Sequence, residues 1–190
     1  MTHLMATDSQ RDRANQGKRR LSRRSVLSGF GAVGMGALAG CFGSSNTDAE
    51  FSTDADDEQY REAAASFLTT ATLYKTPGCE CCLEYTSYLE EATDADIEIA
   101  EVDDLAEIKD EYNVPRDIES CHTMDAGEYF VEGHVPQEAI GKLAIEEPDV
   151  AGIALPEMPQ GSPGMPGEKD EEFVIYAVYD DASYDEFMRI

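Results

Sequence analysis

From residue 58 onward, apolar residues recur at spacings that alternate between those of helices and those of strands. Tyr60, Ala64 and Phe67 share one face of a helix, whereas Ala71 and Leu73 alternate with polar residues as in a strand. Helices are predicted around residues 60–67, 81–92, 105–112 and 136–143. Strands are predicted around residues 69–75, 97–99, 129–135 and 173–179.

Strands that alternate with helices predict an α/β sandwich, in which a mixed, partly parallel sheet is flanked by helices. The order in which a strand leads through a cysteine loop into a helix, followed by strand, helix and further strands, is that of a thioredoxin-like domain. Four prolines in residues 156–166, with several glycines, predict a long loop without helix before the last predicted strand.

The first 41 residues have the layout of an export signal. Four arginines in residues 19–24 precede a short apolar stretch at 26–39, which contains too many small residues to form a good membrane span. Residues 22–27 resemble a twin-arginine signal, and the sequence Leu-Ala-Gly-Cys that ends at Cys41 resembles a lipobox. We expect lipid on Cys41 and a location on the outer face of the cytoplasmic membrane. An uncleaved, weak membrane anchor is the alternative.

Two further segments follow this signal. Residues 42–57 are rich in Ser, Thr, Asp and Glu, which is typical of a flexible acidic tether. Residues 58–190 hold all the predicted helices and strands and therefore form the predicted thioredoxin-like domain.

The composition is strongly acidic, because 14 Lys and Arg face 40 Asp and Glu, for a formal net charge of −26. Phosphate binding needs a basic surface, so this charge argues against nucleic acid as a partner. Removal of residues 1–40 would leave 7 basic and 38 acidic residues, a net charge of −31. Molar salt shortens the Debye length to about 3 Å, which screens the repulsion between surface carboxylates. We therefore expect this acidic surface in a salt-loving prokaryote, an archaeon in particular.

The chain has five cysteines, and if Cys41 carries lipid, four remain in the exported domain: Cys79, Cys81, Cys82 and Cys121. Outside the cytosol, such thiols are used in disulfides or as metal ligands. Three of the four lie at the start of a predicted helix, where unpaired N–H groups and the helix dipole favour thiolate. A set of buried or disulfide-linked cysteines without chemistry is the alternative, although three cysteines in four residues cannot all pair locally.

A second group of candidate ligands lies farther along the chain. Cys121, in the sequence Ser-Cys-His-Thr, follows the helix predicted at 105–112, so the thioredoxin-like order places it beside the cysteine loop as a fourth thiolate. His122 and His134 could ligate metal, orient a ligand, or be hydrogen-bonded structural residues. Met158 and Met165 could offer thioether sulfur, but such residues more often pack a loop against the core.

Several motifs, in order, resemble those of the DUF411 family, which comprises exported, thioredoxin-like metal-binding proteins associated with copper homeostasis. The motifs are KTPGCECC at 75–82, VP at 114–115, SCHT at 120–123, EGHVP at 132–136 and MPQGSPGM at 158–165. The resemblance implies copper handling through the cysteines of the first and third motifs. Glu80 and Glu157 depart from the family pattern, and neither departure removes a sulfur.

These features predict a lipid-anchored protein that sequesters or transfers Cu(I) in copper homeostasis. Cu(I) prefers thiolate and thioether ligands, and closely spaced cysteines could bridge several Cu(I) ions; Zn(II) would also accept such ligands but is the less favoured ion. The expected partners are copper ions, the lipid membrane and copper-handling proteins. A thiol–disulfide oxidoreductase that uses Cys79 and Cys82, with Cys81 or Cys121 as the resolving thiol, is the alternative.

The acidic coat leads to a prediction about salt. We expect the protein to fold in molar KCl and to lose structure on dilution into low salt, because unscreened carboxylates repel one another. Circular dichroism followed against KCl concentration measures this directly. A spectrum and melting temperature that do not change with salt would contradict the prediction.

Overall fold

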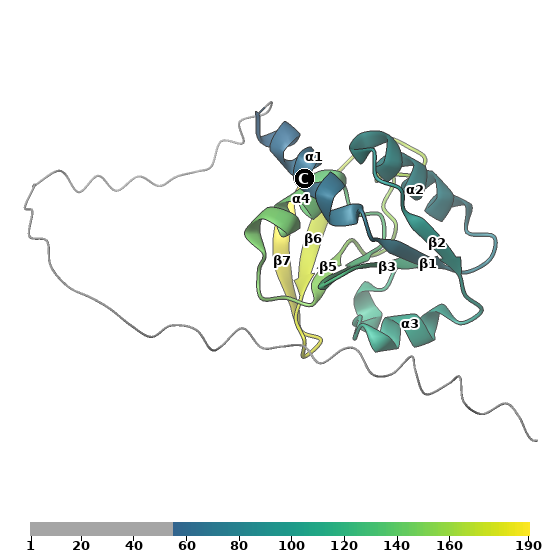
Figure 1. The fold of residues 1–190 in the computed structure, drawn as a ribbon. Helices are drawn as coiled ribbons and strands as arrows, with labels where there is room; N and C mark the ends of the chain where they lie inside the picture. Colours follow the sequence, from purple (N-terminus) through teal and green to yellow (C-terminus); the bar gives the residue numbers. More distant parts are fainter. Residues whose placement is uncertain (1–54) are drawn as a thin grey trace, which may run out of the picture. The chain divides into compact units, whose positions relative to one another are not determined.

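The computed structural model describes residues 55–190 of the chain, in which helices and strands alternate (Figure 1). The helices of this part are α1 (Ala55–Leu68), α2 (Glu80–Thr93), α3 (Leu105–Glu111), the 3-10 turn η2 (Arg116–Ile118) and α4 (Gln137–Glu146). The strands are β1 (Thr72–Lys75), β2 (Glu98–Glu101), β3 (His122–Ala126), β4 (Tyr129–Glu132), β5 (Gly152–Ala154), β6 (Val174–Val178) and β7 (Tyr184–Arg189).

The described strands form one mixed seven-stranded sheet in the order β2-β1-β3-β4-β5-β6-β7. The pairs β1–β2 and β4–β5 are parallel, and the other neighbours are antiparallel. The segment from β1 to α4 therefore has the strand–helix–strand–helix–strand–strand–helix order of a thioredoxin-like domain. The predicted α/β sandwich with a mixed sheet flanked by helices is confirmed.

Helices cover both faces of the sheet (Figure 1). On one face, α1, α2 and α4 pack together over the largest apolar cluster, in which Leu68, Leu89, Ile140 and Leu143 have no exposed surface. On the other face, α3 lies against β1 and β3, and a smaller cluster forms around Phe130. Burial of each such Leu or Ile side chain contributes about 1.5–3 kcal/mol, so these clusters hold the helices on the sheet.

The predicted helices and four predicted strands correspond to α1, α2, α3, α4, β1, β2, β4 and β6. The strand predicted at 129–135 is shorter than expected and ends at Glu132, because Gly133 follows in the left-handed region with φ +75°. The proline-rich segment 155–172 contains no helix, as predicted. Three strands were not predicted, namely β3, β5 and β7.

The predictions for the amino-terminal segment lie largely outside the described residues. The twin-arginine signal and lipobox in residues 1–41, with the lipidation site Cys41, lie wholly outside them, as does the predicted tether up to residue 54. The last residues assigned to that tether belong to α1, which begins at Ala55. None of the helices within residues 55–190 is both long enough and apolar enough to cross a bilayer.

Candidate metal centre

Strand pairing brings distant cysteines to one end of the sheet. β1 ends at Lys75, and the turn that follows it leads directly into α2. β3 runs antiparallel to β1, with His122 opposite Lys75, so the start of β3 lies beside the end of β1. Cys121 immediately precedes β3 and therefore lies next to the amino terminus of α2.

The first turn of α2 holds the other three cysteines. Cys79 is the N-cap residue with extended backbone, φ −73° and ψ 93°, and Cys81 and Cys82 follow within the first turn. Cys82 is fully buried, whereas Cys79 and Cys81 are half-buried. The helix end therefore directs sulfur both toward the core and toward the surface.

All four sulfur atoms converge. Cys79 and Cys82 form a disulfide, with their Cα atoms 5.4 Å apart, while Cys81 and Cys121 are free thiols. The Cys121 Sγ lies 3.6 Å from the Cys82 Sγ and 3.9 Å from the Cys81 Sγ. The four Sγ atoms all lie within 4.8 Å of one another, a spacing at which reduced cysteines can share metal ions. The structure therefore brings together the four predicted cysteine ligands.

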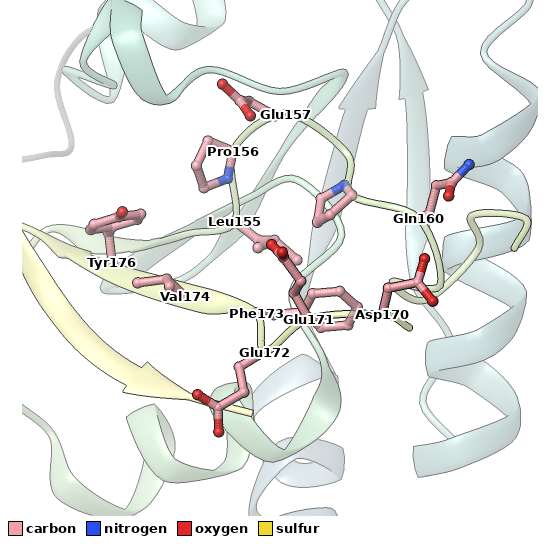
Figure 2. Close-up of a pocket in the computed structure, with 11 residues that line it drawn as sticks. Leu155, Pro156, Glu157, Gln160, Asp170, Glu171, Glu172, Phe173, Val174 and Tyr176 are labelled. Carbon is pink, nitrogen blue, oxygen red and sulfur yellow. The ribbon is translucent and has the colours of Figure 1, made fainter. Parts of the chain in front are cut away.

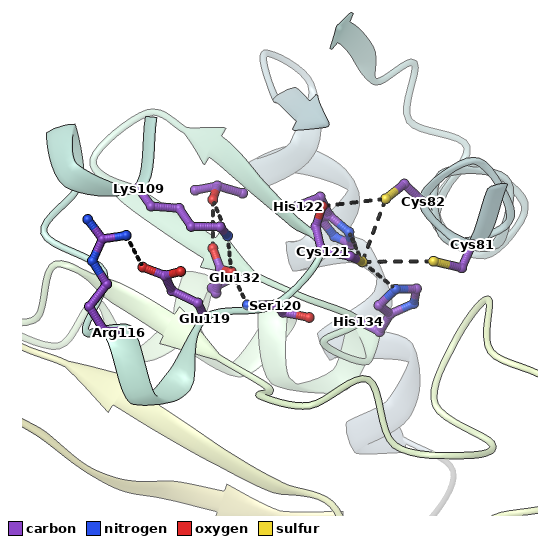
Figure 3. A network of polar contacts seen from close by, with 11 residues as sticks. Cys81, Cys82, Lys109, Arg116, Glu119, Ser120, Cys121, His122, Glu132 and His134 are labelled. Carbon is purple, nitrogen blue, oxygen red and sulfur yellow. Dashed lines mark hydrogen bonds and ion pairs between the residues drawn. The ribbon is translucent and has the colours of Figure 1, made fainter. Parts of the chain in front are cut away.

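Two buried imidazoles approach the same sulfur (Figure 3). The His134 Nε2 lies 3.1 Å and the His122 Nδ1 lies 3.3 Å from the Cys121 Sγ. Both side chains are completely buried, His122 at the start of β3 and His134 two residues after the end of β4. The His122 Nε2 has no hydrogen-bond partner among the described residues. Both predicted histidines therefore lie at the sulfur cluster.

Burial keeps these groups neutral in the metal-free site. Burial, with the neighbouring Cys81 sulfur, raises the pKa of the Cys121 thiol to about 12. Burial also lowers the pKa of His134, and it lowers that of His122 further because His134 and Lys109 add positive potential. A metal ion that binds Cys121 must therefore displace a proton, so binding weakens as the pH falls.

The proline-rich loop covers the site from the side of α2. Its Pro163 carbonyl accepts a hydrogen bond of 2.6 Å from the His134 Nδ1. Gly164 lies so close to α2 that an added Cβ would stand 2.5 Å from the Tyr85 amide nitrogen, and its φ is +76°. Met158 and Met165 are half-buried in the same loop. Glycine is therefore required where the loop meets the helix that carries the cysteines.

A buried ion pair supports the segment that carries Cys121, and the sequence analysis did not identify it (Figure 3). Lys109 from α3 pairs with Glu132 at the end of β4, and both side chains are almost fully buried. The Glu132 carboxylate also accepts hydrogen bonds from the Ser120 amide at 2.5 Å and from the Thr123 hydroxyl at 2.6 Å. The residues on either side of the Cys121–His122 pair are thus tied to one carboxylate. One feature of the sequence could have indicated this ion pair: Lys109 is a lysine in a segment with few basic residues.

The structure also has an acidic groove of about 480 Å³ between the proline-rich loop and the start of β6 (Figure 2). Its carboxylates are Glu157, Asp170, Glu171 and Glu172. Carboxylate oxygens are hard ligands, and none of the predicted metal-ligating cysteines or histidines lines the groove. Soft metal ions should therefore bind at the sulfur cluster rather than in this groove.

Comparisons with known proteins agree with this view of the site. Residues 118–165 match DUF411, a family described as "protein of unknown function". Two solved structures of the copper resistance protein copG, Form 1 and Form 2, are similar at 30% sequence identity and a TM-score of 0.59. The match covers 64% of this chain and 97% of the Form 2 chain, or 96% of the Form 1 chain. No curated protein matches the chain.

The buried ion pair gives a prediction about stability and pH. Lys109→Met leaves the Glu132 carboxylate buried without its partner and should lower the free energy of unfolding at pH 7 by about 3–5 kcal/mol. Burial already raises the pKa of Glu132, and loss of the ammonium raises it further. The stability that a raised carboxyl pKa provides is complete below the unfolded value, about 4.3, and is lost as the pH rises. The deficit of the variant should therefore grow with pH.

Denaturant unfolding in molar salt at several pH values measures this deficit. Lys109→Met combined with Glu132→Gln should recover most of it, because no charge is then buried alone. Arg189→Met is the matched control, since the Arg189–Glu186 pair is exposed and its loss should leave the free energy of unfolding nearly unchanged. An equal deficit at every pH, or no recovery in the double variant, would show that the pair is not ionised.

Proposed function

The chain belongs to the DUF411 family, and from this membership and its converging sulfurs we propose that it binds Cu(I) for sequestration or transfer. The ligands in this proposal are the thiolates of Cys79, Cys81, Cys82 and Cys121. The copper resistance protein to which the chain is similar supports copper as the ion.

The convergence of all four Sγ atoms within 4.8 Å is the observation that carries the proposal. Thiolates are soft ligands and select Cu(I) over hard cations, whereas Zn(II) accepts thiolate and imidazole alike. Three of the sulfurs come from one helical turn, so one relaxed tetrahedron around a single ion is difficult to form. The same sulfurs can bridge several Cu(I) ions in a small cluster.

Cu(I) binding by all four cysteines requires the reduced protein. The Cys79–Cys82 disulfide withdraws two of the four thiolates, so its reduction must precede full loading. Half-burial of Cys79 and Cys81 gives an incoming ion access to the cluster, while Cys82 and the imidazoles close it from inside.

The setting of this chemistry follows from the amino-terminal motifs. We propose that the twin-arginine signal exports the protein and that lipid on Cys41 holds it at the outer face of the cytoplasmic membrane. The acidic segment that follows Cys41 then serves as a tether, and copper-handling proteins at the membrane are the partners that supply or receive the ion.

Cu(I) titration of the reduced protein in molar salt, against a competing Cu(I) chelator, tests the proposal. We expect more than one Cu(I) per chain, and Cys121→Ser should lower both the stoichiometry and the affinity because it removes the sulfur that approaches both Cys81 and Cys82. Leu83→Ser is the matched control, since this exposed neighbour of Cys82 leaves all four sulfurs in place. One firmly bound Zn(II) with no uptake of Cu(I) would refute the proposal.

The Cys79–Cys82 disulfide favours a second candidate function, thiol–disulfide exchange. In this function, Cys79 and Cys82 as thiols would give two electrons and two protons to a substrate disulfide and become disulfide-linked themselves. The Cys81 Sγ, 3.6 Å from the Cys79 Sγ, is placed to act as a resolving thiol.

A disulfide-reductase assay on the reduced protein separates the two functions. The assay supplies a dithiol reductant that restores the Cys79–Cys82 thiols after each cycle. An oxidoreductase should then turn over many times, whereas a copper carrier should not raise the rate above that of the reductant alone. Cys121→Ser should lose copper loading while it keeps the Cys79–Cys82 pair. Sustained turnover that survives in Cys121→Ser would make the enzymatic function the primary one.

A further inference from the structure

We propose that the acidic groove between the proline-rich loop and β6 binds an extended, lysine- or arginine-rich segment of a partner protein. Apolar and acidic side chains line this groove together (Figure 2). The interface lies outside the sulfur cluster and does not depend on Cu(I) binding. The apolar residues of the lining are Leu155, Pro156, Pro159, Phe173, Val174 and Tyr176.

Part of the apolar lining comes from a sheet face that α3 does not reach. In β6, Val174 and Tyr176 point away from Ile175, which belongs to the apolar cluster under α1, α2 and α4. The helix on the other face is α3, but it packs on β1 and β3, which β4 and β5 separate from β6. Val174 and Tyr176 therefore remain half-buried. An apolar surface with a charged rim is typical of a site that binds a partner.

Four carboxylates form the rim of the groove. Glu157 comes from the beginning of the proline-rich loop, whereas Asp170, Glu171 and Glu172 come from its end. All four side chains are exposed, and none of them forms an ion pair with a Lys or Arg of residues 55–190. A basic segment of a partner would supply the missing counter-charges.

The spacing of these carboxylates favours several separate cations over one metal ion. In the described part of the chain, only two groups of Cys, His, Asp or Glu side chains bring three or more ligand atoms within 4.8 Å of one another, and both contain Cys121. No three of the groove carboxylates can therefore share one ion. Alternate side chains of an extended segment are about 6.4–6.8 Å apart, so successive Lys or Arg residues can reach different carboxylates.

Lys169 already makes the kind of contact that a lysine of the partner would make. Its Nζ lies 4.9 Å from the centroid of the Phe173 ring, which is a cation–π contact. In molar salt the Debye length is about 3 Å, so attraction between distant charges is cancelled and only direct contacts remain. The aliphatic stem of Lys or Arg can pack on the apolar lining while its charge meets the rim. This combination distinguishes the groove from carboxylates elsewhere on the acidic surface.

The loop that bounds the groove also covers the sulfur cluster. Its Pro163 carbonyl accepts the hydrogen bond from the His134 Nδ1, and its Gly164 lies against α2. A segment bound in the groove therefore contacts the same loop that closes the metal centre.

Binding of a basic peptide to the copper-free protein in molar KCl tests the inference. The probe is a blocked, dye-labelled peptide with the sequence Lys-Pro-Lys-Leu-Lys-Pro-Lys, and fluorescence anisotropy measures its affinity. We expect saturable binding that Glu171→Lys combined with Glu172→Lys weakens by more than about tenfold, because like charges then face the peptide. Glu62→Lys combined with Glu91→Lys is the matched control, since it changes the net charge equally at exposed positions of α1 and α2. The control should weaken binding by less than about twofold.

Wild-type protein labelled with ¹⁵N supplies a readout that needs no variant. The peptide should shift the amide signals of residues 155–160 and 170–176, and Mg(II) at the same ionic strength should not. Each of four results would overturn the inference: no saturable binding, equal losses in the two charge variants, shifts spread over the whole acidic surface, or an equal response of the groove to Mg(II).

The apolar lining can be tested apart from the charges. Tyr176→Ser should weaken binding of the peptide without a change in net charge, because the lysine stems lose apolar contact. Circular dichroism checks that this variant is folded, and a folded variant with unchanged affinity would contradict the role of the lining. All these measurements use protein without copper, so their outcome is independent of Cu(I) uptake by the cysteines.

Discussion

The antiparallel pairing of β3 with β1 is the contact on which the site depends. It places residue 122 opposite residue 75, so a cysteine 39 residues beyond Cys82 comes to the first turn of α2. The return of β4 beside β3 brings His134 to the same end of the sheet. These two strand pairings thus bring the cysteine sulfurs and both imidazoles together, and the apolar clusters on both faces of the sheet keep the pairings in place.

The sequence predicted the elements whose apolar residues are periodic, and it missed those whose residues are not. β3 is almost fully buried, yet it reads His-Thr-Met-Asp-Ala. The Lys109–Glu132 pair binds its Thr123 hydroxyl and the Tyr112 hydroxyl donates to its Asp125 carboxylate, in place of water. β5 has only three residues, and β7 is a largely exposed edge strand with acidic residues, so neither shows the pattern of a buried strand. Nonlocal pairing, rather than local preference, makes these segments strands.

The convergence of the four cysteines could be predicted, because the spacing of three of them and the order of the helices and strands can both be read from the sequence. The contacts that position the cysteines and histidines could not be predicted in this way. The Pro163 carbonyl that orients His134 belongs to the backbone, which the sequence letters do not reveal. Lys109 and Glu132 lie 23 residues apart and meet only after α3 has packed on the sheet.

The burial of the Lys109–Glu132 pair determines how it responds to salt. Mobile ions weaken attraction between exposed charges, but they do not enter a dry interior, where the two partners have almost no accessible surface. The ion pair that supports the segment around Cys121 is therefore little affected by the ionic strength of the solvent. A change in salt concentration therefore acts mainly on the exposed carboxylates and leaves the contacts around Cys121 in place.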